Sequence, residues 1–210
     1  MERANILNTT IDNLTMQETL QAVVHAIHNS KQIHHVVVNA GKMVAMQRDL
    51  KLRQSVNSCD LINADGQAVV WASRILGQPL KERVAGIDLM ENLVELAYNK
   101  NFKIFFFGAK EEVVSSVVKK YKIKYSKDII AGYRNGYFNK EDEGHIAQQI
   151  SDSGADILFV AISSPFIPKL ALASMTTASS ASPVPSLQTI PTATAEITKP
   201  APFRFRMPQK

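Results

Sequence analysis

The sequence has little cysteine: Cys59 is the only one among 210 residues. A single thiol excludes an internal disulfide and any metal site built from several cysteines, so a reducing, cytoplasmic setting is predicted. No run approaches the roughly 18 apolar residues that a membrane-spanning helix needs, and the N-terminus lacks the apolar core of a signal peptide. We therefore expect any contact with a membrane to be made from one side.

Two nucleotide-binding fingerprints are also missing. The sequence contains neither the Gly-x-x-x-x-Gly-Lys-Ser/Thr phosphate loop nor the Gly-x-Gly-x-x-Gly dinucleotide motif. Their absence counts against a phosphate-loop enzyme and against a nucleotide-dependent oxidoreductase on a similar sheet. The histidines show no metal-ligand spacing, since His25 and His28 fall on a predicted helix and His34 and His35 flank a predicted strand. No metal site is expected.

Acidic residues are scarce in only one part of the chain. Residues 1–165 hold 19 Lys and Arg against 18 Asp and Glu, whereas residues 166–210 hold five basic residues and one acid, Glu196. The net charge of +5 therefore comes mostly from the last 45 residues. A nearly neutral body predicts that the partner is not a nucleic acid.

Glycine is absent from the same last segment. Eight of the nine prolines lie at or beyond Pro165, and Ala, Ser and Thr fill Ala171–Ser182. This composition predicts one domain over residues 1–165, followed by a disordered Ser/Thr/Ala/Pro-rich tail over residues 166–210. The two aromatic and two basic residues of Phe203–Arg206 predict at most a weak contact with an anionic membrane.

Before that point, short β-branched runs alternate with amphipathic helical patterns, as in parallel βαβ units. The Thr15–Glu18 segment has the capping-box pattern that begins a helix. The candidate strands are mostly apolar, which is typical of strands buried on both faces. We predict a Rossmann-like, open, mainly parallel sheet with helices on both faces. The candidate strands are His35–Asn39, Asp60–Ala64, Phe102–Phe107, Asp128–Tyr133 and Asp156–Ile162.

Ligands of such sheets bind beyond the carboxyl ends of the strands, so the residues that follow each strand are the candidate site. Asp65 and Gly66 follow one strand and suit a general base beside a close ligand approach; the alternative is that Asp65 caps the next helix. Asn39 and Lys42 follow another strand, where backbone amides and a cation could bind phosphate. The alternative there is an ordinary strand-to-helix turn.

Two further segments have the same character. Gly108 and Lys110 follow the Phe102–Phe107 strand and suit a diphosphate or ribose at the sheet edge. Arg83 and Gly86 precede a predicted helix, where an arginine can bind phosphate with two parallel hydrogen bonds. The alternative for Arg83 is a surface arginine paired with Glu82 or Asp88.

Taken in order, these motifs resemble the WecG/TagA/CpsF family over about residues 4–165. The Asp-Gly and Glu-Arg-x-x-Gly-x-Asp segments are the most specific of them. The motifs that carry the resemblance are His34–Ala40, Ala64–Arg74, Leu76–Met90, Phe106–Lys110, Gly136–Phe138 and Ala155–Ala161.

The resemblance implies an inverting, UDP-sugar-dependent hexosyltransferase of cell-surface polysaccharide synthesis. Such an enzyme moves N-acetylmannosamine, or its uronic acid, from a UDP donor to undecaprenyl-diphosphate-linked N-acetylglucosamine. By the same resemblance Asp65 is the catalytic base, Arg83 belongs to the donor pocket and Asn39 lies near the substrate. No cofactor or metal is implied, because arginine and backbone amides can neutralise the leaving diphosphate. The remaining implied substrate-binding residues are Gly66, Gly86, Gly108, Lys110 and Tyr137.

The chain departs from the family pattern in two places. Val37 stands where the family often has a threonine, and after Ser164 and Pro165 the family's glycine-rich stretch and basic, membrane-docking ending are not found. The alternative function is therefore a truncated, non-catalytic product of the family that binds nucleotide sugar. In either case we expect a peripheral and weak contact with the inner face of the plasma membrane.

Overall fold

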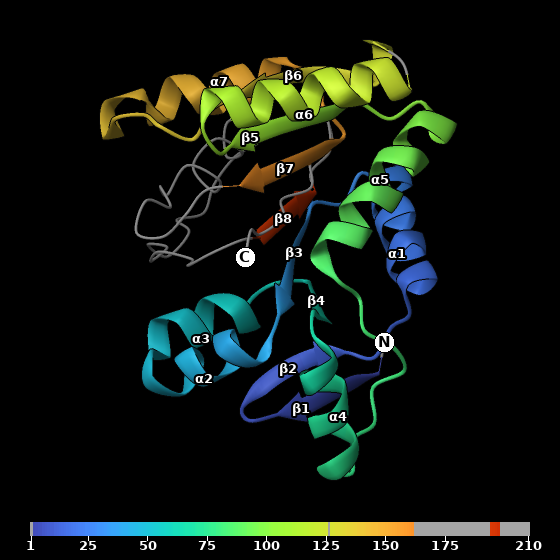
Figure 1. Ribbon diagram of the computed structural model, residues 1–210. Coiled ribbons are helices and arrows are strands. Elements are labelled where there is room, and N and C mark those ends of the chain that lie inside the picture. Colours follow the sequence, from blue (N-terminus) through green and yellow to red (C-terminus); the bar gives the residue numbers. More distant parts are fainter. Residues whose placement is uncertain (1, 126, 162–193, 198–210) are drawn as a thin grey trace.

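The computed structural model describes residues 2–125, 127–161 and 194–197 (Figure 1). The strands are β1 (Arg3–Ile6), β2 (Thr9–Asp12), β3 (Ile33–Val38), β4 (Leu61–Ala64), β5 (Ile104–Gly108), β6 (Ile130–Arg134), β7 (Ile157–Ala161) and β8 (Thr194–Ile197). The α-helices are α1 (Met16–His28), α2 (Ala40–Arg48), α3 (Leu50–Asn57), α4 (Gln67–Ile75), α5 (Gly86–Lys100), α6 (Glu111–Lys124) and α7 (Glu143–Asp152). Short 3-10 turns occupy Lys127–Ile129 and Lys140–Asp142.

Six strands form the main sheet, in the order β4-β3-β8-β7-β5-β6. Strand β4 runs parallel to β3, and β5 runs parallel to both β7 and β6. Strand β8 lies antiparallel between β3 and β7. The predicted α/β fold with a mainly parallel sheet is confirmed, and the two parallel halves meet at one antiparallel strand.

The segment predicted to be a disordered tail is described only at residues 194–197, which form β8. Residues 162–193 and 198–210 lie outside the described residues, as does the predicted domain boundary at residue 165. Within the described part of the chain, no helix is both long enough and apolar enough to cross a membrane.

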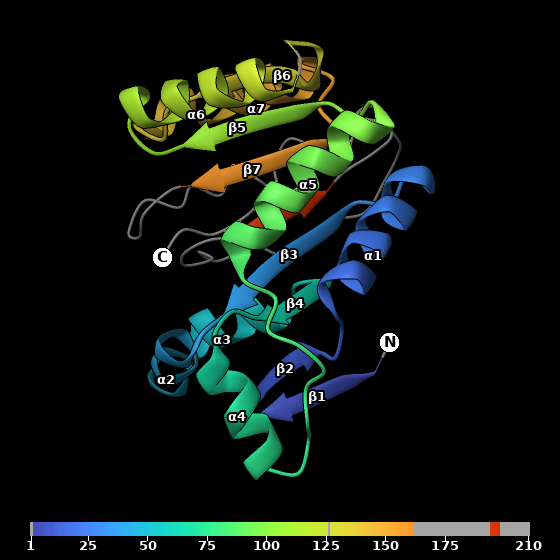
Figure 2. The ribbon, with the colours of Figure 1, turned by 45° about the vertical axis from the view of Figure 1, so that its right-hand side comes forward.

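Helices cover both faces of the sheet, as the sequence predicted (Figure 2). Successive side chains of a strand point to opposite faces. Phe106 therefore belongs to the core cluster that contains residues of α1, α5 and α6, whereas Phe105 belongs to the cluster that contains residues of α7. Around β3 and β4 the second face is covered by α2, α3, α4 and the β1–β2 hairpin. The strands are apolar on both sides because each side carries its own helical layer.

The predicted capping box is found at the expected place. The Thr15 hydroxyl accepts a hydrogen bond from the Glu18 amide at 3.2 Å, and the Glu18 carboxylate accepts one from the Thr15 amide at 2.8 Å. This capping box begins α1. Asn139 and Asp142 are also linked, at 3.0 Å, but they begin a 3-10 turn that continues into α7.

The β1–β2 hairpin is an element that the sequence analysis did not predict. Its turn places Leu7 and Asn8 at φ angles of 49° and 60°, a region that leucine seldom adopts. Without an Asn-Gly or Asp-Gly pair, the usual sequence signal for this turn is missing. Asp12 joins the hairpin to the sheet, because its carboxylate accepts a hydrogen bond from the Ile62 amide at 2.7 Å.

Candidate functional site

The pairing of β3 with β4 brings two predicted site residues together. Val38 pairs with Ala64, so Asn39 and Asp65 leave the sheet at neighbouring positions. The Asp65 amide donates to the Val38 carbonyl at 2.8 Å, which extends the pairing by one residue. Both side chains line the same cavity at the carboxyl end of the sheet.

The capping alternative for Asp65 is not what the structure shows. The N-cap of α4 is Gly66, and among the described residues no side chain caps this helix. Gly66 has a φ angle of 154°, which favours glycine over residues with a Cβ atom. Asp65 therefore lines the cavity and does not serve as the cap of α4.

Asn39 does cap a helix, so its position fits the turn alternative as well as a ligand role. Its Oδ1 accepts from the Lys42 amide at 2.9 Å at the start of α2. The Lys42 ammonium donates to the Val37 carbonyl at 2.9 Å. Burial lowers the pKa of Lys42 to about 8, while Cys59 and Asp65 act in the opposite direction. Lys42 is thus a partly buried cation electrostatically coupled to Asp65.

Gly86 reaches the cavity because the loop before α5 is bonded to the end of β4. The Val84 amide donates to the Ala64 carbonyl at 2.9 Å, which places the first residues of α5 beside Asp65. The N-cap of this helix is Ala85, which has no side chain that can accept a hydrogen bond. Backbone amides of the first turn of α5 therefore face the carboxyl edge of the sheet.

The first three helices differ from the next three in how they begin. Thr15, Asn39 and Asp49 cap α1, α2 and α3 with their side chains. Within the described chain, α4, α5 and α6 have no side-chain cap bond. Because uncapped N-terminal amides and the positive end of the helix dipole attract anions, α5 and α6 offer phosphate-binding ends near the cavity.

Gly108 ends β5 where β7 comes closest. Its φ angle is 119°, and a Cβ atom built on it would lie 2.3 Å from the Ala161 carbonyl oxygen. The next residue, Ala109, also has a positive φ angle and donates its amide to the Ala161 carbonyl at 2.5 Å. Packing alone therefore requires glycine here, and the same close backbone lines the cavity.

The cavity has a volume of about 740 Å³, which is within the range of small-molecule sites. Five residues singled out from the sequence line it: Asp65, Asn39, Lys42, Gly86 and Gly108. Among the described lining residues, Asp65 is the one acid and Lys42 the one cation. The rest of the wall is mostly apolar and includes Val37, Leu52, Ile87, Met90, Phe106, Val113, Val117 and Phe159.

The other predicted residues lie outside the described cavity lining. Arg83 is exposed, and its Nη2 lies 4.0 Å from Asp88 Oδ2, which is the surface pairing weighed from the sequence. Lys110 is the N-cap of α6, and Tyr137 is exposed beyond β6. Gly66 adjoins Asn39, because a Cβ atom built on Gly66 would lie 3.8 Å from the Cβ atom of Asn39.

A buried polar pair links β3 to β4 and was not singled out from the sequence. His35 Nε2 donates to Asn63 Oδ1 at 2.8 Å, and Asn63 Nδ2 donates to the Thr19 hydroxyl at 3.1 Å. Burial lowers the pKa of His35 to about 3, so the ring is neutral at physiological pH. The available signal was Asn63 itself, an amide inside an otherwise apolar run. The pair joins α1 to β3 and β4 two residues before Asp65.

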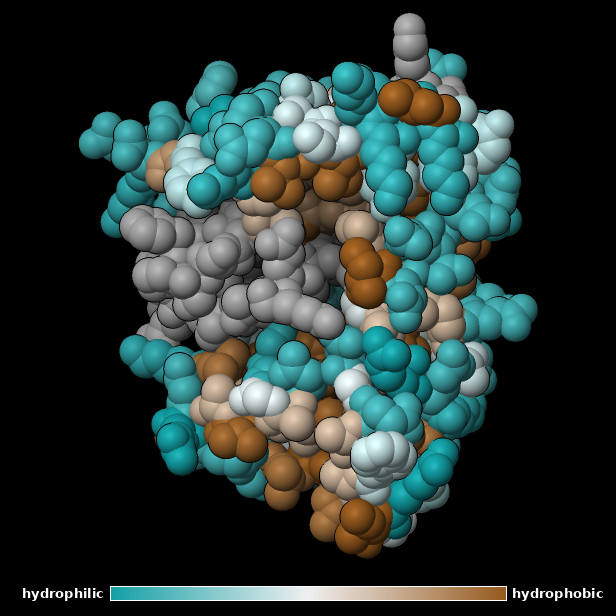
Figure 3. All heavy atoms as spheres, viewed as in Figure 1, coloured by the Kyte–Doolittle hydropathy of each residue, from teal (hydrophilic) through white to brown (hydrophobic). Residues whose placement is uncertain are grey.

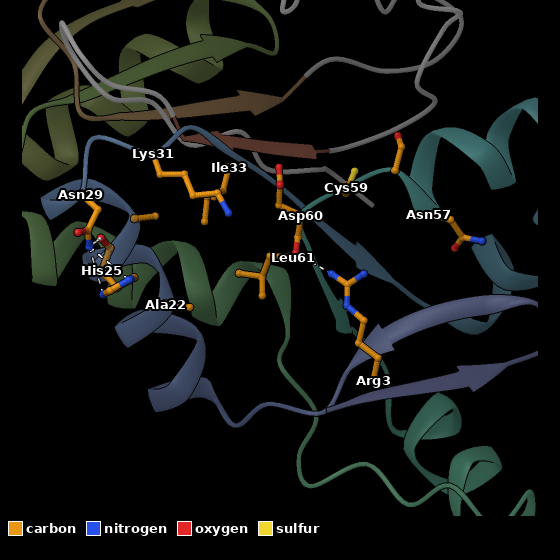
Figure 4. Close-up of a pocket in the computed structure, with 12 residues that line it drawn as sticks. Arg3, Ala22, His25, Asn29, Lys31, Ile33, Asn57, Cys59, Asp60 and Leu61 are labelled. Atoms are coloured by element: carbon orange, nitrogen blue, oxygen red, sulfur yellow. Dashed lines mark hydrogen bonds between the residues drawn. The ribbon is translucent and has the colours of Figure 1, made fainter. Parts of the chain in front are cut away.

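A second cavity of about 470 Å³ lies at the opposite ends of β3 and β4 (Figure 4). Ile33 and Leu61, the first residues of these strands, line it. Its most prominent cation, Arg3, donates to the Asp12 carboxylate and to the Asp60 carbonyl, both at 2.8 Å. The first bond lies within the hairpin and the second ties the hairpin to the residue before β4, which indicates a structural role. The cavity at the carboxyl ends is therefore the candidate functional site.

Fold and site together define an α/β protein with a mostly apolar ligand cavity at the carboxyl edge of its sheet, beside two uncapped helix N-termini. The chain belongs to the WecG/TagA/CpsF family of glycosyl transferases, whose family model matches residues 4–167. The matched range contains all the residues named above as the candidate site.

Curated relatives carry a specific activity in their names. The chain is 36% identical over 110 residues to the N-acetylglucosaminyldiphosphoundecaprenol N-acetyl-beta-D-mannosaminyltransferase of Bacillus spizizenii, covering 52% of this chain and 42% of that protein. It is 35% identical over 128 residues to the protein of the same name from Bacillus subtilis, covering 61% and 49%. The chain thus matches somewhat less than half the length of these relatives.

Proposed function

We propose that this chain transfers N-acetylmannosamine, or its uronic acid, from a UDP donor to undecaprenyl-diphosphate-linked N-acetylglucosamine in cell-surface polysaccharide synthesis. The observation that carries the proposal is that Asp65 lies beside Asn39 in a strand-end cavity of a chain from a glycosyl transferase family. The names of the two relatives supply the donor sugar and the acceptor. The reaction would take place at the inner face of the plasma membrane.

The transfer proceeds by a single displacement with inversion. The Asp65 carboxylate takes the proton of the acceptor hydroxyl, and that oxygen forms a bond to the anomeric carbon of the donor sugar. The bond between the anomeric carbon and the diphosphate oxygen breaks, and UDP leaves with the electron pair. A positioned base that removes the proton as the new bond forms lowers the barrier, because no free alkoxide is needed.

The leaving diphosphate is held by cations and backbone amides. Lys42 supplies a charge inside the cavity, and the N-termini of α5 and α6 supply amide donors at its rim. Arg83 lies three residues before Gly86, where an exposed guanidinium can turn from Asp88 to the diphosphate. The apolar wall near Met90 and Val117 takes the uracil ring. Stabilisation of this kind requires no metal ion.

A transfer assay with a panel of donors tests the proposed function. The purified chain is incubated with synthetic polyprenyl-diphosphate-linked N-acetylglucosamine and, separately, with the UDP derivatives of N-acetylmannosamine, its uronic acid and N-acetylglucosamine. We expect a disaccharide-lipid product from a mannosamine donor and none from UDP-N-acetylglucosamine. Donor binding measured by calorimetry without any transfer would support the non-catalytic alternative instead.

Substitutions of the two cations test which of them holds the diphosphate. We expect Arg83→Ala to weaken donor binding about tenfold or more, and Arg83→Lys to weaken it less, because a planar guanidinium can hold two oxygens. Lys42→Met keeps most of the unbranched side chain and removes its charge, and we expect a loss of the same order. Calorimetric titration with the UDP-sugar measures both. Unchanged affinity in both Arg83 variants would make Arg83 a surface residue.

A further inference from the structure

Helix α4 is apolar on its outer face as well as its inner one. Val69, Val70 and Ser73 point inward and are buried, whereas Trp71 and Ile75 lie one turn apart on the opposite side. Their exposed fractions are 59% and 85%, and Leu76, the C-cap of the helix, is 51% exposed. Figure 3 shows hydrophobic residues gathered at this end of the molecule, below the hairpin. A surface helix normally carries polar residues on such a face, so an exposed apolar one indicates an interaction surface.

Residues 66–80, which contain α4, carry a single charge. Helix α4 contains Arg74, which is exposed, and no acidic residue occurs from Gly66 to Leu80. Apolar and aromatic side chains beside a cation match the interfacial layer of a bilayer with anionic lipids, where tryptophan rings lie at the level of the headgroups. Binding to another protein would not require acidic residues to be absent from this face, whereas binding to anionic lipids does.

Helix α4 lies close to the candidate site, which connects its exposed apolar face to the proposed reaction. Helix α4 begins two residues after Asp65, and its nine residues span about 14 Å. Resting on the proposed function, which requires a lipid-linked acceptor, we infer that Trp71, Ile75 and Leu76 form a membrane-docking surface for anionic lipid headgroups. Docking through this surface holds Asp65 within about one helix length of the bilayer, where the acceptor sugar emerges from the headgroup layer.

Trp71 reports directly on this surface because it is the only tryptophan of the chain. The full chain is mixed with vesicles of phosphatidylglycerol and phosphatidylcholine, and with vesicles of phosphatidylcholine alone. We expect the Trp71 emission to shift to the blue on anionic vesicles and to be quenched by brominated lipid. Binding through any other part of the chain leaves Trp71 in water and overturns the inference.

A pair of exposed isoleucines, Ile75 on α4 and Ile123 on α6, tests whether vesicle binding depends on this face or on any exposed apolar side chain. Ile75→Glu should lower the vesicle partition coefficient about tenfold or more, since a full aliphatic side chain is kept out of the apolar layer. Ile123, on α6, is 77% exposed, and Ile123→Glu should leave partitioning unchanged within twofold. Arg74→Gln should weaken binding about fivefold on anionic vesicles only. Equal losses in both isoleucine variants would reject α4 as the docking surface.

Three controls distinguish the possible outcomes. A blue shift that grows with protein concentration in the absence of lipid indicates a second copy of the chain on α4 and overturns the inference. Thermal melts of the Ile75→Glu variant should match those of the unmodified chain, because Ile75 packs against little. Vesicle binding needs no turnover, so Asp65→Asn should bind vesicles normally. Vesicle docking by the unmodified chain without any sugar transfer would support the surface and count against the proposed function alone.

Discussion

The Asp65→Asn variant is expected to fold normally and to transfer sugar about a hundredfold more slowly, or worse, than the unmodified chain. The amide has nearly the same shape as the carboxylate but cannot accept a proton from the acceptor hydroxyl. Asp65 is not the N-cap of α4, so the change removes no helix-capping bond. The loss should therefore fall on the rate of the chemical step rather than on stability.

Initial rates at saturating donor and acceptor measure this effect, and a thermal melt checks the fold. Asp152→Asn is a matched control, because Asp152 ends α7 and accepts a hydrogen bond from Gln148 at 2.7 Å, away from the cavity. It should transfer at the normal rate. If the folded Asp65→Asn variant keeps more than about a tenth of the activity, another group removes the proton and Asp65 only lines the cavity.

The sequence predicted the part of the site that depends on strand ends. Asn39, Asp65 and Gly108 each follow an apolar run, and parallel strands bring their carboxyl ends to one edge of a sheet. This rule is enough to place the three residues on one cavity without knowledge of any contact. The predicted carboxyl ends of β3 and β5 each differ from the observed ends by one residue, and this difference did not affect the placement of Asn39 and Gly108.

Other features depend on contacts between distant residues, and for them the sequence pattern was insufficient. Gly86 reaches the cavity through the hydrogen bond of Val84 to Ala64, whereas nearby Arg83 turns to Asp88. The spacing of the motif does not distinguish these two outcomes, since both residues belong to the same loop. The hairpin turn at Leu7 is stabilised by its surroundings rather than by a glycine, so local propensity could not indicate it.

The Gly108→Ala variant is expected to lower the free energy of unfolding by about 2–4 kcal/mol. Two effects add at this position. The φ angle of 119° is costly for alanine, and the new Cβ atom would lie 2.3 Å from the Ala161 carbonyl oxygen. The end of β7 cannot retreat without losing the hydrogen bond that its carbonyl accepts from Ala109. Urea unfolding followed by circular dichroism measures the change.

Two further glycines separate the strain from the overlap. Gly77 has a φ angle of 73° with nothing within 4 Å of a built Cβ atom, so Gly77→Ala should cost about 1 kcal/mol through backbone strain alone. Gly144, in α7, has neither feature, and Gly144→Ala should be neutral or stabilise by up to about 1 kcal/mol. If Gly108→Ala costs no more than Gly77→Ala, β7 moves aside at little cost. The close approach at Ala161 would then not be what requires glycine at the edge of the cavity.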